Sequence, residues 1–282
     1  MLLTKKKAHK INEKFSDRRS NRLALGIILC YRLALFFLSE IKRYSYLFFI
    51  NVCRSKDFEI VNSLYLNGFT KIENFLNENE IEFIKSLSCQ IERDFLDGNF
   101  KNPKNTSFNG SIRVWSLLEY DSYLSDKFYR SRRLLNIAKK FYGNKPILPF
   151  EGIYQKSLPQ EDSDELPFGQ RGWHFDGNKH TLKFFLLVEN CDLENGPFAY
   201  IKSSALPLSL HKLNKIFRVF LGGGIPATYY SRSEALKYKL NKKGVPLIGK
   251  AGDVIIADTH GIHRAMLQKS GTRKVMVSYF KD

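Results

Sequence analysis

The sequence predicts an α+β fold in which helices come first and an antiparallel β-sandwich or barrel follows. Three observations predict it. Helical patterns fill the chain from about residue 58 to residue 142. After that, short β-rich runs recur, with Gly, Pro, Asn and Asp between them. Finally, 43% of the 282 residues are hydrophobic and 14% are aromatic, which is enough apolar material for a packed core.

The helical part contains three predicted elements. Residues 58–75 read as a short helix, then Gly68, then a strand. Asn77 is placed to cap a helix that runs to about Phe95, because acids fill its first turn and apolar residues follow at helical spacing. A further helix is predicted over 122–142, where a Gly-Asn pair follows.

The β-rich part contains five apolar runs of strand length, each bounded by turn-forming residues. The predicted strands cover 147–155, 181–190, 198–203, 253–259 and 274–280. If the second run alternates, Lys183 and Phe185 share a face, which is either the interior or the outside of the barrel. Residues 205–245 show no clear pattern beyond a short helical stretch, SEALKYKL.

The net charge of +17, from 45 basic and 28 acidic residues, favours anionic partners. Residues 1–22 hold eight Lys or Arg and only two acids, so part of this charge belongs to the N-terminal segment. No zinc finger or aromatic RNA-binding strand motif is present in the sequence. We therefore expect a small-molecule substrate, anionic or lipid-linked, and no nucleic acid partner.

The four cysteines are widely spaced and form no Cys-x-x-Cys pair. This argues against a cysteine zinc site or a disulfide framework. A reducing, cytoplasmic setting is the natural prediction.

Residues 1–56 are predicted to form a separate basic segment with a hydrophobic or amphipathic helix. Its apolar run, 23–38, is interrupted by Arg32 and followed by Lys42 and Arg43. Three interpretations remain open: the helix lies in a membrane interface, packs on the main domain, or spans the membrane. The first predicts peripheral membrane contact through residues 1–50.

A metal site is suggested by His174 and Asp176. In extended chain, residues two apart point to the same face, so both side chains can reach one ion. His263, which follows the predicted strand 253–259, is the best candidate for a third ligand. Two His and one carboxylate suit a non-haem iron(II) site with open positions, and also a zinc hydrolase. Other histidines compete for the third place, namely His180, His211 and His260.

Arg273 favours an oxygenase among these alternatives. It lies ten residues after His263, at the start of the next predicted strand, so a hairpin return would bring it near the metal. A guanidinium can hold the far carboxylate of 2-oxoglutarate through two parallel hydrogen bonds. A hydrolase gives this arginine no natural role.

The sequence resembles the phytanoyl-CoA dioxygenase family of iron(II)- and 2-oxoglutarate-dependent oxygenases. The likeness covers about residues 58–280 and leaves residues 1–56 outside. Four blocks carry it: WHFDG at 173–177, the strand and E-N-G-P turn within 182–204, the G-D block with its distal His and Arg within 252–280, and NGFTKIENFLNENEI at 67–81.

The resemblance implies a double-stranded β-helix (a cupin-like jelly roll) with flanking helices over 57–282. It implies iron(II) as metal, with 2-oxoglutarate and O₂ as cosubstrates. His174 and Asp176 match the ligand pair, and the third ligand matches His263. Arg273 matches the cosubstrate anchor, and Gln155 matches a position that often contacts cosubstrate or substrate.

The sequence departs from the family after Tyr200, where IKSSALPLSL lacks the usual Gly-Ser-His. The substrate therefore cannot be carried over, and acyl-CoA, phospholipid, nucleotide-sugar and glycan substrates all remain open. Asp176 is intact, whereas relatives that halogenate replace this carboxylate, so hydroxylation is expected. The alternative hypothesis is a non-catalytic, membrane-associated basic binding protein on a jelly-roll scaffold.

Overall fold

A computed structural model describes five stretches of the chain and seven helical residues between Cys30 and Ser45. The five stretches are residues 57–159, 172–177, 179–205, 212–216 and 228–281. Most of the predictions for residues 1–56, and His211, lie outside the described residues. Among the residues that are described, no helix has both the length and the apolar character needed to cross a membrane.

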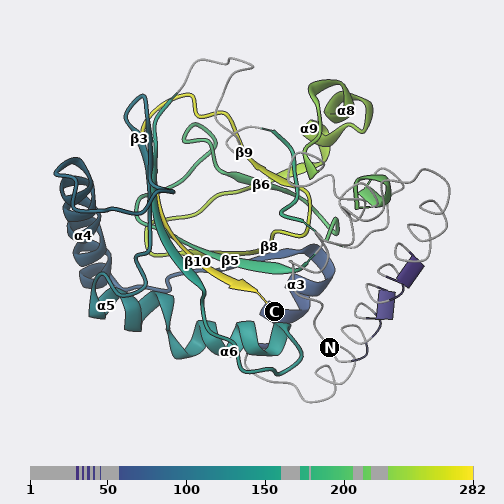
Figure 1. Ribbon diagram of the computed structural model, residues 1–282, viewed down its shortest axis with the longest axis horizontal. Coiled ribbons are helices and arrows are strands. Elements are labelled where there is room, and N and C mark those ends of the chain that lie inside the picture. Colours follow the sequence, from purple (N-terminus) through teal and green to yellow (C-terminus); the bar gives the residue numbers. More distant parts are fainter. Residues whose placement is uncertain are drawn as a thin grey trace, which may run out of the picture.

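Two antiparallel sheets form the core (Figure 1). The larger sheet has seven strands, in the order β1 (Phe69–Ile72), β8 (Val254–Asp258), β5 (Thr181–Leu187), β10 (Arg273–Lys281), β4 (Glu151–Ser157), β3 (Ser111–Trp115) and β2 (Thr106–Phe108). The smaller sheet has the order β7 (Gly244–Leu247), β6 (Phe198–Ile201) and β9 (His263–Ala265). A single bridge between His174 and His263 adds one more segment beside β9. This arrangement is the predicted double-stranded β-helix.

The alternation of side chains along the strands divides the core into two parts. On β10, Met276 and Phe280 pack in the cluster beneath the helices, whereas Val275 and Val277 pack in the cluster between the two sheets. Arg273 lies in the same alternation as Val275. The side chain of Arg273 therefore lies on the same sheet face as Val275 and Val277, which is the face inside the jelly roll.

Helices cover the outer face of the larger sheet (Figure 1). They are α3 (Phe58–Asn67), α4 (Glu78–Leu96), α5 (Ser122–Leu124), the π-helix η1 (Ser125–Tyr129) and α6 (Arg132–Phe141). Two short helices, α8 (Arg232–Lys237) and α9 (Leu240–Lys243), lie near the smaller sheet instead. The helices thus leave the inner face of the larger sheet available for a site.

The predicted start of α4 is confirmed. The Asn77 side chain accepts a hydrogen bond from the Glu80 backbone N–H at 3.0 Å, and the Glu80 carboxylate accepts one from the Asn77 N–H at 2.9 Å. This capping box satisfies two of the backbone donors that a helix start leaves open. The prediction of a helix, Gly68 and a strand over 58–75 is also confirmed, as α3 and β1.

The single helix predicted over 122–142 is wrong. The chain forms α5, η1 and α6 there, with a break at Arg130 and Ser131. Both adjacent aromatic residues, Phe128 and Tyr129, are fully buried. A π-helix has more residues per turn than an α-helix, so it changes which side chains face the core. Here it lets both neighbouring rings pack in the core, which the regular α-helical spacing of the sequence did not predict.

The predicted strand boundaries need smaller corrections. The strand expected from residue 147 begins only at Glu151, after Pro149, which lacks the N–H that a sheet ladder requires. Four strands were not predicted: β2, β3, β7 and β9. They contain three to five residues each, too few for a clear hydrophobic period.

Tyr200 and Gly261 tie the turn before β9 to the smaller sheet. The Tyr200 hydroxyl donates to the Asp258 carbonyl at 2.7 Å, and a Cβ on Gly261 would lie 1.6 Å from that hydroxyl oxygen. We therefore expect Gly261→Ala to lower the free energy of unfolding by about 1–3 kcal/mol, measured by denaturant unfolding. Gly172→Ala is the matched control, since its Cβ would meet Tyr229 only at an ordinary 3.5 Å. Equal stability of the two variants would contradict this close packing.

Candidate metal centre

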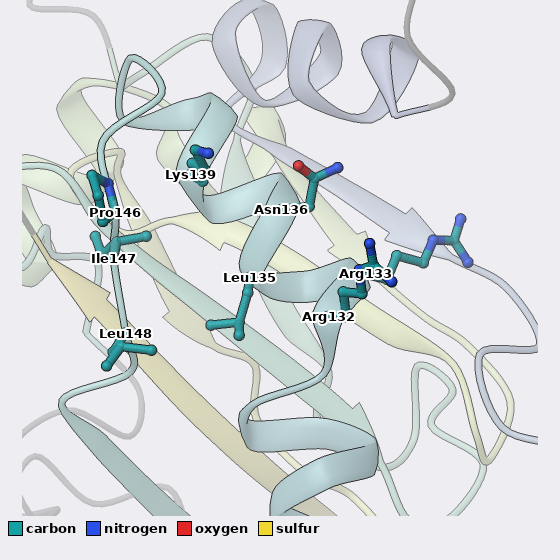
Figure 2. Close-up of a pocket in the computed structure, with 8 residues that line it drawn as sticks. All are labelled: Arg132, Arg133, Leu135, Asn136, Lys139, Pro146, Ile147 and Leu148. Carbon is teal, nitrogen blue, oxygen red and sulfur yellow. The ribbon is translucent and has the colours of Figure 1, made fainter.

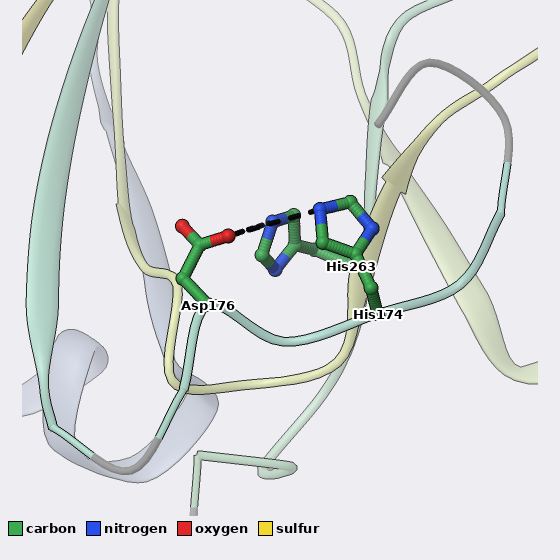
Figure 3. A group of neighbouring side chains, drawn as sticks. All are labelled: His174, Asp176 and His263. Carbon is green, nitrogen blue, oxygen red and sulfur yellow. Dashed lines mark ion pairs between the residues drawn. The ribbon is translucent and has the colours of Figure 1, made fainter. Parts of the chain in front are cut away.

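The structure brings His174, Asp176 and His263 together (Figure 3). One ligand atom from each residue lies within 4.8 Å of the other two. In Figure 3 the Asp176 carboxylate faces both imidazole rings. Among the described residues, this is the one group of at least three His, Cys, Asp or Glu side chains with metal-site spacing.

Backbone hydrogen bonds hold the three residues in register. The His174 N–H donates to the His263 carbonyl at 2.9 Å, and the His263 N–H donates back at 2.8 Å. The Asp176 N–H donates to the Thr259 carbonyl at 2.8 Å. Each ligand is therefore positioned by main-chain bonds and not by side-chain packing alone.

Both histidines direct their Nε2 atoms toward the carboxylate of Asp176. His174 Nδ1 lies 2.9 Å from the Gly172 carbonyl, and His263 Nδ1 lies 2.9 Å from the Gly261 carbonyl. A carbonyl only accepts hydrogen bonds, so each Nδ1 carries the proton and each Nε2 keeps its lone pair. Backbone carbonyls of this kind orient metal-binding histidines and raise their basicity.

Aromatic neighbours restrict the two imidazole rings. Tyr229 stacks on His174 with centroids 4.6 Å apart and an interplanar angle of 5°. Phe198 stacks on His263 at 5.1 Å and 24°. With Nδ1 bonded and one ring face covered, neither ring can rotate freely away from the centre.

The donor spacing fits a small divalent metal ion. Asp176 Oδ1 lies 3.8 Å from His174 Nε2 and 3.7 Å from His263 Nε2. Two donors that each bind an ion at about 2.1 Å can be at most about 4.2 Å apart. The side chain of Asp176 is 24% exposed, against 9% and 3% for the two histidines. Solvent therefore reaches the group more readily at Asp176 than at either histidine.

The two carboxylate oxygens of Asp176 have different partners. Oδ1 faces the histidines, while Oδ2 forms an ion pair with Lys183 Nζ at 2.6 Å. Burial opposes charge on both groups, yet the ion pair raises the pKa of Lys183 and helps hold the pKa of Asp176 well below its usual range. Lys183 thus points into the barrel, one of the two orientations that the sequence left open.

The competing histidines lie elsewhere. His260 Nδ1 lies 2.8 Å from the Gly177 carbonyl, and its ring packs against His180 with centroids 4.6 Å apart. His180 Nδ1 in turn lies 2.5 Å from an oxygen of Asp258. The group with metal-site spacing contains His263 and neither His260 nor His180.

Arg273 and Gln155 lie in one hydrogen-bonded row across the inner face of the larger sheet. Arg273 Nη2 donates to Ser157 Oγ at 3.2 Å, and its Nη1 donates to the Gly196 carbonyl. Gln155 Nε2 donates to the same Ser157 Oγ at 3.1 Å. Arg113 Nη2 completes the row by donating to Gln155 Oε1 at 3.1 Å.

Arg113 is a candidate residue that the sequence reasoning missed. It lies opposite Gln155 in the β3–β4 register, two residues from Trp115 on the same face. Burial is the main cause that lowers the pKa values of His174 and Arg273, and the charge of Arg113 lowers both further. Alternation along SIRVW would have predicted the face of Arg113, had the strand been recognised.

The charges of Arg113 and Arg273 have no carboxylate partner within ion-pair distance among the described residues. Arg273 is 9% exposed, and its Nε has no hydrogen-bond partner in the described part of the chain. A buried charge without a counterion is costly, so this row is suited to receive an anionic ligand.

A separate hollow lies on the outer surface of α6, on the helix-covered side of the larger sheet (Figure 2). Its lining is basic and apolar: Arg132, Arg133, Leu135, Asn136, Lys139, Pro146, Ile147 and Leu148. None of these residues belongs to the group with metal-site spacing. Exposed cations of this hollow, such as Lys139, therefore serve as controls for cations at the metal centre.

No protein-family model matches the sequence, and a comparison with curated proteins found no match. Solved structures do resemble this chain in fold. AviO1 from Streptomyces viridochromogenes Tue57 is 18% identical, with a TM-score of 0.54 over 79% of this chain and 94% of its own. SnoK, a non-heme alpha ketoglutarate dependent carbocyclase, is 15% identical, with a TM-score of 0.55 over 81% and 84%. EctD from S. alaskensis, solved with 2-oxoglutarate and 5-hydroxyectoine, is 13% identical, with a TM-score of 0.57 over 81% and 76%.

These likenesses show the fold alone, a jelly roll that the chain shares with SnoK and EctD. Membership of the phytanoyl-CoA dioxygenase family stays a prediction.

The two histidines are expected to bind metal with reduced competition from protons near neutral pH. Burial lowers the pKa of His263 to about 3 and also lowers that of His174, so protons compete less with a metal at both rings than at an ordinary histidine. We expect the Co(II) affinity, measured by spectral titration, to fall less between about pH 8 and about pH 6 than it would for two histidines with the ordinary pKa of about 6.5. A steep loss of affinity as the pH falls through about 6.5 would contradict this.

Proposed function

We propose that this protein is an iron(II)- and 2-oxoglutarate-dependent oxygenase that hydroxylates an unactivated C–H bond. The observation that carries the proposal is the pairing of two features on one jelly roll. One is the His174, Asp176 and His263 group, and the other is the hydrogen-bonded row with Arg273 and Arg113.

The donor set fits iron(II). Two imidazole nitrogens and one carboxylate oxygen on one side of an ion form the facial triad of non-haem iron oxygenases. These three residues would hold the metal, leaving its other positions for 2-oxoglutarate and O₂. A zinc hydrolase would use the same three ligands, but it gives the two arginines no task.

The arginine row fits a dicarboxylate. Arg273 is the anchor for the far carboxylate of 2-oxoglutarate, because a guanidinium can donate two parallel hydrogen bonds to a carboxylate. Gln155 and Arg113 continue the row beyond Ser157, where they can donate to the cosubstrate or the substrate. Bound 2-oxoglutarate would supply the missing counterion.

Each protein group then has a defined task. The Gly172 and Gly261 carbonyls keep the Nε2 atoms directed at the metal, and Tyr229 and Phe198 cover the rings and exclude water. When bound, iron(II), 2-oxoglutarate and O₂ supply the oxidative chemistry, which yields succinate, CO₂ and a hydroxylated product. The presence of Asp176 supports hydroxylation over halogenation.

The solved structures support the cofactor part of this proposal. EctD was solved with bound iron and with 2-oxoglutarate, and SnoK is described as alpha ketoglutarate dependent. SnoK is a carbocyclase and the related SnoN is an epimerase, so the fold serves several outcomes. For this chain the proposed substrate is a small molecule or a lipid- or glycan-type compound.

We further propose that the N-terminal segment makes peripheral contact with anionic membranes. The described residues of this segment are helical, and their apolar side chains are exposed. The exposed fractions are 64% for Tyr31, 46% for Phe37, 60% for Leu38 and 63% for Ile41. Their spacing places Tyr31, Leu38 and Ile41 on one helical face. Lys42 and Arg43 follow directly, as in interfacial helices that meet anionic lipid.

The oxygenase proposal predicts succinate formation that requires Fe(II), 2-oxoglutarate and His174. Arg273→Met should raise the KM for 2-oxoglutarate about 10- to 150-fold, since it removes hydrogen bonds to a charged group worth about 1.5–3 kcal/mol. Succinate release is the measurement, and Lys139→Met is the control. Undiminished turnover in His174→Ala, or an unchanged KM in Arg273→Met, would refute the assignment.

The membrane proposal predicts that full-length protein co-sediments with vesicles of anionic phosphatidylserine and not with neutral phosphatidylcholine vesicles. Leu38→Glu should weaken this binding, because it places a charge on the apolar face of the helix. Leu96→Glu is the matched control, since Leu96 is also exposed (77%) but lies on α4 of the folded domain. Equal binding by the two variants, or no binding by the wild type, would overturn the proposal.

A further inference from the structure

Lys183 is an unusual neighbour for a metal ligand. Its Nζ lies 2.6 Å from Asp176 Oδ2, although a cation beside a metal site repels the incoming ion. The side chain is only 14% exposed. Burying this ammonium group costs desolvation energy, and its charge would repel a metal ion. We therefore expect Lys183 to bring a benefit to the site.

The position of Lys183 follows from β5 and its register. Lys183 is paired with Tyr279 of β10 and with Ala257 of β8, on the face that looks into the barrel. Its ammonium lies 4.8 Å from the centre of the Tyr279 ring, and that ring stacks on Trp115 at 6.1 Å. Two packed strands and an aromatic pair thus direct this lysine at Asp176.

The contact divides the Asp176 carboxylate between two partners. Oδ1 faces both Nε2 atoms, at 3.8 Å and 3.7 Å, and Oδ2 is engaged by Lys183. A carboxylate whose second oxygen is held in this way is directed to offer a metal one oxygen only. A carboxylate free to offer both would occupy a position that the cosubstrates need.

We propose that Lys183 is a positioning residue that holds Asp176 Oδ2, so that Asp176 binds the metal through Oδ1 alone. This inference rests on the proposed metal site. It concerns the geometry of that site and does not depend on the identity of the substrate. It also explains a lysine that the resemblance to known oxygenases did not assign.

Two variants separate positioning from charge. Lys183→Gln keeps a hydrogen-bond donor and loses the charge, whereas Lys183→Met has similar length and loses both. Because both variants remove the positive charge, its repulsion of the metal cancels when they are compared. Any difference between the two variants therefore shows the effect of the hydrogen-bond donor to Asp176 Oδ2.

Co(II) alone is the probe, added to the full-length metal-free protein. The ligand-field absorption of Co(II) reports its coordination number, and the titration gives its affinity. We expect Lys183→Gln to keep the wild-type spectrum. Lys183→Met should show an altered spectrum and bind Co(II) about 10- to 100-fold more weakly than Lys183→Gln, as is typical when a residue that orients a metal ligand is lost. Lys139→Met, in the α6 hollow, should behave as wild type.

Equal spectra and equal affinities of the Gln and Met variants would overturn the role of Lys183 and leave the oxygenase proposal intact. Absence of Co(II) binding by the wild type would overturn both. Wild-type Co(II) binding with the expected variant difference, but without succinate formation, would support Lys183 and refute the oxygenase.

A crystal structure of the Co(II)-loaded wild type covers the case in which Lys183→Met fails to fold. Oδ2 should remain on Lys183. Both Asp176 oxygens within bonding distance of the metal would overturn the proposal.

Discussion

The candidate site depends on one pair of backbone hydrogen bonds, between His174 and His263. The two residues are far apart in the sequence, and they come side by side only because the segment before β5 pairs with β9. A second pair of contacts sets the direction of both imidazole rings, since each Nδ1 bonds a carbonyl two residues earlier in its own chain segment. The Asp176 amide bond to Thr259 then places the carboxylate opposite them. Main-chain hydrogen bonds thus bring the three candidate metal ligands together.

Electrostatics then divides the inner face of the larger sheet into two regions. Near the ligands, Lys183 and Asp176 form a close ion pair. Farther along the sheet, Arg113 and Arg273 are joined through neutral groups, Gln155 and Ser157. Arg273 is buried and Arg113 is half-buried, and neither has a carboxylate partner among the described residues, so an anion bound at this row would lower the cost of burying their charge. The proposed dicarboxylate cosubstrate would supply the missing negative charge.

The two faces of the larger sheet have separate tasks. The hydrophobic outer face packs against α3, α4 and α6. Ion pairs of Glu92 on α4 with Lys156 and Lys274 also link α4 to the strands. The inner face carries the polar and aromatic side chains of the site. The period of two along a strand makes this division possible, because adjacent residues of β10 serve opposite faces. Lys274 thus contacts Glu92, while Arg273 contacts Ser157.

The sequence by itself determined the elements whose signals are local. The capping box at Asn77, the turn at Gly68 and the long β-rich runs could be predicted because their chemistry lies within a few residues. The pair His174 and Asp176 could be predicted for the same reason. Only the tertiary structure decided the rest. The neighbouring sequence does not indicate that Lys183 reaches Asp176 or that Arg113 bonds to Gln155. It also does not indicate that residues 122–142 break into three helices. These outcomes depend on strand register and on the packing of distant side chains, which a single sequence does not display.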